Sequence, residues 1–363
     1  MEGDNRVVQD VKETTHSKNT KTELKGNVGK TKLALVLEYL EKDLIAADLK
    51  WSLFIAACHS YRYDSCLKPF PSMYLKDDVK DIDLMKEDII KIPALNLVIF
   101  LKDSEKCHLE KSTIDLLYWV LIQQKEPTLK SIPNSEIDNV LKLVPSELFA
   151  KRPDYIFKVE YCRESMMERT WTSSKENYDT LFAYHGSRLE NFHSILNFGL
   201  QQHLNKNTLF GQGIYLSSEL IVSLPYSQNG CAWGKSLIGS ELSVVALCEM
   251  INHPTINCQS KDGSNDKSRA KAKDSFAGEV PHKFYLVPNS DLVRVRYLLV
   301  YSTCPPYPHN PLESRTFFGW LKEHKYATIL IAYIAMLASV GFSHNQYIQR
   351  FYKMICHKIG LYF

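Results

Sequence analysis

The second half of the chain holds a series of short β-type runs, and their close spacing restricts the fold more than any other feature. The runs are rich in Val, Ile, Tyr and Phe and lie at 155–162, 181–184, 213–216, 242–250, 284–287 and 293–301. Most gaps between them are too short for the crossover connections that parallel strands require. The sequence therefore predicts an α+β fold with a mostly antiparallel sheet, formed by residues 155–302.

Helical patterns come before these runs. Apolar residues recur at helical spacing, with charges on the opposite face, at 33–63 (one long helix or two short ones), 82–90 and 113–123. Residues 32–130 are therefore predicted to form a small helical domain, followed by a proline-containing linker at 131–154. Within the β-rich half, residues 189–198 also have helical spacing, and that helix is expected to end at Gly199.

Two polar segments are expected to lie outside the core. Residues 1–31 contain almost no large apolar side chain, so they cannot bury enough surface to offset the entropy of ordering, and we predict that they are disordered. Residues 257–279 are polar without apolar periodicity and are predicted to form a surface loop.

The charge balance and the cysteine content limit which binding partners and which cellular compartment the sequence predicts. With 44 basic and 41 acidic side chains the formal net charge is +3, which is too balanced for a dedicated nucleic-acid binder. The 9 cysteines show no C-x-x-C pair, and no apolar run stands near the N-terminus. We therefore expect free thiols in a reducing compartment and no metal site.

Residues 326–343 contain no charged side chain. A helix of this length spans about 27 Å at about 1.5 Å per residue, which is enough for a thin bilayer. We predict a single transmembrane helix after a linker at 303–325, with a short tail at 344–363 and the preceding chain in the cytosol. A buried core helix is the alternative for this segment.

The residue pattern of most chemical interest is His185-Gly186-Ser187 near a strand end, with Tyr215 following a glycine-flanked turn about 30 residues later. Glycine lets the backbone approach a planar amide closely, a serine can add a hydrogen bond, and a tyrosine ring can stack on a flat heterocycle. These features describe a pocket for an aromatic amide such as nicotinamide. The alternative is a histidine and a tyrosine that belong to the core.

The ordered motifs of this half resemble the catalytic domain of the poly(ADP-ribose) polymerase family of ADP-ribosyltransferases. They are His-Gly-Ser-Arg at 185–188, Asn-Phe at 191–192, Ile-Leu at 195–196, Gly-Leu at 199–200, Phe-Gly-Gln-Gly-Ile-Tyr at 210–215 and Arg-Tyr-Leu-Leu-Val-Tyr at 296–301. With the helical part and the uncharged C-terminal run, the chain is most similar to the tail-anchored, mono-ADP-ribosylating branch of the endoplasmic reticulum. That resemblance implies an ADP-ribosyltransferase fold, NAD as co-substrate and protein acceptors, this chain itself among them. It also implies attachment to the endoplasmic-reticulum or nuclear-envelope membrane with the catalytic domain in the cytosol.

The resemblance also implies roles for single residues. His185 would hydrogen-bond a ribose hydroxyl of NAD, and Gly186 would hold the nicotinamide carboxamide through its backbone. Tyr215 would line the nicotinamide pocket. Ser223 and Tyr226 fall where the family has a serine that bonds the carboxamide and a tyrosine that stacks on the ring.

One position departs from the family pattern. Chain-elongating members carry a glutamate as the third catalytic residue, and counting back from 294–297 places Phe284 there, with Tyr285 beside it. Neither side chain is a carboxylate, so we predict transfer of a single ADP-ribose. Phe284 also motivates a second interpretation, a catalytically weak or inactive NAD-binding scaffold at the membrane.

Overall fold

The computed structural model describes residues 31–100, 109–145, 148, 150–202, 212–260, 283–303 and 333. The chain divides into two compact units, residues 1–306 and 307–363. Residues 1–30 of the predicted disordered segment lie outside the described residues, as does the predicted helix 326–343 apart from Tyr333. In the ranges that are described, no helix is long and apolar enough to cross a membrane.

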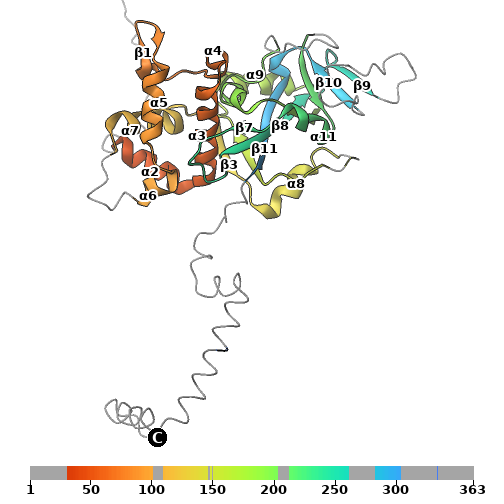
Figure 1. Cartoon of the computed structure of the whole chain (residues 1–363). Coiled ribbons are helices and arrows are strands. Elements are labelled where there is room, and N and C mark those ends of the chain that lie inside the picture. The colour runs from red at the N-terminus through yellow and green to blue at the C-terminus, as the bar shows by residue number, and fades with distance from the viewer. Residues whose placement is uncertain are drawn as a thin grey trace, which may run out of the picture. The chain divides into compact units, whose positions relative to one another are not determined.

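Helices dominate the N-terminal part of the first unit (Figure 1). They are α2 (Lys32–Lys42), α3 (Leu44–His59), α4 (Tyr63–Cys66), α5 (Ile82–Lys91), α6 (Leu95–Phe100) and α7 (Lys111–Tyr118), which continues as a π-helical turn (Trp119–Gln123). A small hairpin of β1 (Leu75–Lys76) and β2 (Val79–Lys80) precedes α5. The predicted helical stretch 33–63 is thus divided, because Asp43 leaves helical geometry and caps α3 by accepting a hydrogen bond from the Ala46 amide at 3.0 Å.

Helix α3 is the centre of the helical part. Of its 16 residues, 13 are buried, so the helix is apolar on every side rather than amphipathic. It packs against α2 and against elements of the sheet half, namely the 3-10 turn Leu189–Asn191, α10 (Phe192–Phe198) and β3 (Thr128–Ser131). The helical part and the sheet therefore share their packing within one unit.

The sheet is antiparallel at every pairing of the described strands, as predicted. Its order is β3-β4-β11-β8-β5-β6-β10-β9, and β7 pairs with β8. The strands besides β3 are β4 (Tyr155–Glu160), β5 (Thr180–Gly186), β6 (Ile214–Ser217), β7 (Gly230–Cys231), β8 (Glu241–Ile251), β9 (Asn257–Ser260), β10 (Lys283–Val287) and β11 (Val293–Ser302). This confirms the α+β class. The helix predicted at 189–198 is present, and it ends at Gly199, whose φ of 76° suits glycine.

Three segments differ from their predictions. Asn257–Ser260 is not loop, because its backbone pairs with β10 at the sheet edge; residues 261–279 lie outside the described residues. Strand β3 extends the sheet into the range predicted as helical. The predicted linker 131–154 contains a 3-10 turn (Asn134–Glu136) and α8 (Ile137–Leu141), whose Ile137 and Val140 are buried against the sheet.

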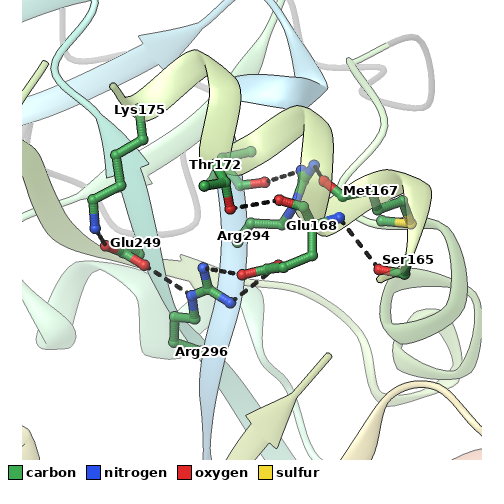
Figure 2. Close-up of polar contacts among 9 residues, drawn as sticks. Ser165, Met167, Glu168, Thr172, Lys175, Glu249, Arg294 and Arg296 are labelled. Carbon is green, nitrogen blue, oxygen red and sulfur yellow. Dashed lines mark hydrogen bonds and ion pairs between the residues drawn. The ribbon is translucent and has the colours of Figure 1, made fainter. Parts of the chain in front are cut away.

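Helix α9 (Met166–Lys175) packs on the sheet through charged groups (Figure 2). Arg296 on β11 donates to Glu249 at 2.8 Å and to Glu168 at 3.0 Å, and Lys175 donates to the same Glu249 at 3.0 Å. The Arg296 guanidinium also lies 5.4 Å from the ring centroid of Trp171. One arginine thus joins α9 to two strands.

Candidate active site

His185 is held in one orientation at the end of β5. Its Nδ1 lies 2.9 Å from the backbone carbonyl oxygen of Tyr215. Because a carbonyl only accepts, Nδ1 carries the hydrogen in the neutral ring, and Nε2 is left as an acceptor. Burial lowers the pKa of His185, and the hydrogen bond to Tyr215, which raises it, does not compensate. The ring is therefore neutral near pH 7 and can accept a hydroxyl hydrogen at Nε2.

Gly186, the last residue of β5, lies close to the backbone of another segment. A Cβ atom at this position would lie 2.1 Å from the Ser223 carbonyl oxygen and 2.8 Å from Tyr226 Cβ. These partners come from α11 (Leu220–Ser223) and the following 3-10 turn (Leu224–Tyr226). Only glycine fits between them, so packing within the protein requires glycine at this position, and the approach of its backbone to an amide ligand stays a prediction.

Ser187 is fixed from two sides. Its amide donates to Ser227 Oγ at 3.1 Å, and its own Oγ accepts from Asn191 Nδ2 at 3.0 Å. The Cys66 thiol in turn donates to Asn191 Oδ1 at 3.2 Å, which ties the site to α4. Neither Ser227 nor Cys66 was predicted as a site residue: Cys66 lies 125 residues from Asn191 along the chain, and Ser227 follows Tyr226 but lies outside the family motifs.

A cavity of about 330 Å³ opens beside these residues. That volume is within the range of small-molecule sites. Four of the predicted site residues line it, namely His185, Gly186, Ser187 and Tyr226. Apolar side chains and side chains from the helical part complete the described wall, among them Ile195, Leu200, Ile214, Arg62 and Ser65.

The other predicted residues are placed differently. Tyr215 and Ser223 are not among the described residues that line the cavity; Tyr215 supplies the carbonyl that holds His185, and Ser223 supplies the carbonyl against Gly186. Phe284 is buried on β10, opposite Ser217 of β6, and neither it nor Tyr285 lines the cavity. Strand β10 carries no carboxylate.

The site suits NAD by its own geometry. The neutral His185 offers an acceptor, the partly buried Gly186 lines the cavity with its backbone, and the cavity beside them is large enough for part of a dinucleotide. No cluster of metal-binding side chains occurs among the residues that the structure describes.

Comparison with known proteins identifies the protein family to which the chain belongs. Residues 134–303 match the poly(ADP-ribose) polymerase catalytic domain, and residues 38–121 match the ARTD15 N-terminal domain. The chain belongs to the poly(ADP-ribose) polymerase family and is an NAD-dependent ADP-ribosyltransferase.

The chain is also similar to individual members of this family. The chain is 38% identical to human protein mono-ADP-ribosyltransferase PARP16, over 88% of this chain and 97% of the relative. It is 37% identical to the mouse protein of the same name, over 89% of this chain and 98% of the relative. Mouse protein mono-ADP-ribosyltransferase PARP8 is 27% identical over 37% of this chain and 17% of that protein.

Proposed function

We propose that the protein transfers one ADP-ribose from NAD to a protein side chain and does so at a membrane. The observation that carries the single transfer is β10, which lacks a carboxylate where chain-elongating members of the family have glutamate. The names of the human and mouse PARP16 relatives, both mono-ADP-ribosyltransferases, support the same reading.

The reaction breaks the bond between ribose and the nicotinamide nitrogen. Nicotinamide leaves as a neutral molecule with the bonding electrons, a side chain of the acceptor protein attacks the electron-poor ribose carbon, and the acceptor's proton goes to solvent. NAD supplies the activated sugar and the leaving group. The protein lowers the barrier by holding both ends of this bond in fixed positions.

Each site residue has a part in that positioning. His185 Nε2 accepts the hydrogen of a ribose hydroxyl, because Nδ1 is committed to the Tyr215 carbonyl. The backbone of Gly186 binds the carboxamide, and the Tyr226 ring packs on the nicotinamide face. Ser187 and Ser223 keep the Gly186 backbone in place.

The decisive experiment is the intact mass of the protein, and of a mixture with candidate acceptors, after incubation with NAD. One added ADP-ribose at each modified site is expected, and His185→Ala should remove the product. A ladder of additions would exclude single transfer. NAD-dependent thermal stabilisation without any mass change would support the scaffold interpretation that Phe284 motivates.

The membrane part of the proposal is supported by the uncharged run 326–343. We place the protein in the endoplasmic-reticulum or nuclear-envelope membrane with the catalytic domain in the cytosol. After alkaline carbonate extraction of cell membranes, the protein should stay in the pellet, and external protease should digest the catalytic domain of intact microsomes. Release of the protein by carbonate, or protection of the domain, would contradict this.

A further inference from the structure

One wall of the NAD cavity comes from the helical part of the chain. Arg62 and Ser65 line the cavity together with His185 and Ser187. Both lie before residue 134, where the match to the catalytic domain begins. The cavity is therefore completed by residues outside that domain.

The segment that carries Arg62 is held firmly against the site. Ser60 Oγ accepts from the Arg62 amide at 3.1 Å, and the Arg62 carbonyl accepts from Ser65 Oγ at 3.0 Å. At the end of α4, the buried Cys66 thiol donates to Asn191, which donates to Ser187. The backbone beneath Arg62 is thus fixed relative to the NAD cavity.

The guanidinium of Arg62, in contrast, has no hydrogen bond or ion pair with any residue in the described part of the chain. The other arginine of the wall, Arg188, forms only a loose ion pair with Glu190, with 3.7 Å between nitrogen and oxygen. No Asp or Glu is among the described residues that line the cavity. In the described part of the wall, Arg62 therefore presents a positive charge without a matching carboxylate.

The pyrophosphate is the anionic group of NAD, and a guanidinium binds phosphate oxygens through paired, charge-assisted hydrogen bonds. We propose that Arg62 is an NAD-binding residue, and that its guanidinium contacts the pyrophosphate from the helical side of the cavity. This rests on the cavity being the NAD site of the proposed function. The helical part then contributes directly to co-substrate affinity.

The pyrophosphate is remote from the bond that breaks, so this contact stabilises the bound substrate and the transition state equally. Removing it should raise KM for NAD and leave kcat almost unchanged. The affinity for ligands that occupy only the nicotinamide end of the site should stay unchanged.

The test measures Arg62→Ala, Arg62→Lys and the wild type in the full chain. KM and kcat come from nicotinamide release, and dissociation constants for NAD, ADP-ribose and benzamide come from calorimetry. We expect Arg62→Ala to weaken NAD and ADP-ribose roughly tenfold, the loss of one charged hydrogen-bonding group, with benzamide affinity unchanged. Arg62→Lys should recover part of the loss, and added salt should weaken NAD binding more in the wild type than in Arg62→Ala.

Arg163→Ala is the matched control, because Arg163 is exposed and does not line the cavity. It should leave all constants unchanged. Unaltered NAD affinity in Arg62→Ala would overturn the proposal, and so would an equal loss of NAD and benzamide, since that indicates damage to the fold. The binding constants decide this even if the wild type transfers no ADP-ribose, so failure of the proposed function is seen separately.

Discussion

Gly186 brings the end of β5 against the Ser223 carbonyl, and a single methyl group tests how much the site depends on that contact. Gly186→Ala places its Cβ 2.1 Å from this backbone oxygen, a distance that real structures avoid, so β5 or the turn must move. We expect NAD affinity to fall at least tenfold, because the carboxamide site is displaced, while most of the fold persists. Calorimetric titration with NAD measures the effect.

Gly234→Ala is the control for that substitution, since an added Cβ at Gly234 meets no atom within 4 Å. Its NAD affinity should equal that of the wild type. Normal NAD binding by Gly186→Ala would show that the turn carrying Ser223 yields easily, and the site would then not be preorganised.

Asp48, on the buried helix α3, makes stability depend on pH. Burial raises its pKa to about 6, against hydrogen bonds from Ser236, Ile238 and Leu237 that lower it. Its other oxygen, Oδ1, has no hydrogen-bond partner among the described residues. The folded state therefore keeps the proton that the unfolded chain loses near about pH 4. The stability contributed by this group is complete below that pH and is lost as pH rises through about 6.

Asp48→Asn removes this dependence. Relative to the wild type, the variant should gain roughly 2 to 3 kcal/mol of unfolding free energy between pH 4 and pH 7.5, because a tenfold change in an acid constant corresponds to about 1.4 kcal/mol. Urea unfolding of both proteins at the two pH values gives the difference. A constant difference would mean that folding does not shift the pKa of Asp48.

At the level of elements, two arginines hold α9 to the sheet, Arg296 through ion pairs and Arg294 through a hydrogen bond to the Met167 carbonyl. Burial raises the pKa of Glu249, but hydrogen bonds from Lys175 and Arg296 outweigh it, and the pKa stays below its usual value. Arg296→Leu leaves Glu249 and Glu168 largely buried without their shared cation. We expect a loss of roughly 3 kcal/mol in unfolding free energy, measured in urea.

Arg152→Leu is the comparison for that variant. Arg152 pairs with Asp138, and both side chains are largely exposed, at 47% and 67%. Such a pair contributes about 0 to 1 kcal/mol. Equal losses in the two variants would show that the ion pairs at α9 are as well solvated as a surface pair.

The strands and helices also differ in how well the sequence predicts them. Strands rich in buried Val and Leu, such as β8 and β11, were predicted almost to their ends, because nearly all their residues are buried on both faces. The strands β3 (Thr-Leu-Lys-Ser) and β9 (Asn-Cys-Gln-Ser) were missed, since each is short and polar. Helix α9 was missed because Trp171 is its one buried residue, and the rest of its attachment is electrostatic.

The residues of the candidate site likewise divide into those that could be predicted from the sequence and those that could not. His185 and Gly186 were predicted because a local motif carries them. Asn191 lies within the same motif region but was not assigned a role, although its four-residue spacing from Ser187 was a usable signal. Contacts such as Asp48 with Leu237, 189 residues apart, leave no pattern in the chain and needed the fold.

At the scale of the whole molecule, the packing of α3 predicts that the helical part and the sheet unfold together. Trp51 on α3 meets Trp233 of the sheet half with ring centroids 6.0 Å apart, and Phe54 meets His193 at 5.4 Å. Residues 31–303 should therefore melt in one cooperative transition by calorimetry, whereas residues 134–303 alone should not fold, because they lack the helix that covers their apolar surface. Two resolved transitions, or a folded 134–303 fragment, would contradict the shared core.

The shared core also has a consequence for folding while the chain is being synthesised. Helix α3 begins at Leu44, but its partners include the sheet, whose inner strand β11 ends only at Ser302. At about 5 to 20 residues per second, a ribosome needs on the order of 10 to 50 seconds to make the chain between them. During that interval α3 cannot pack against a completed sheet, although β3 and α10, which contact it directly, are made earlier. The nascent chain should therefore depend on chaperones that bind apolar helices until the last strand enters the sheet.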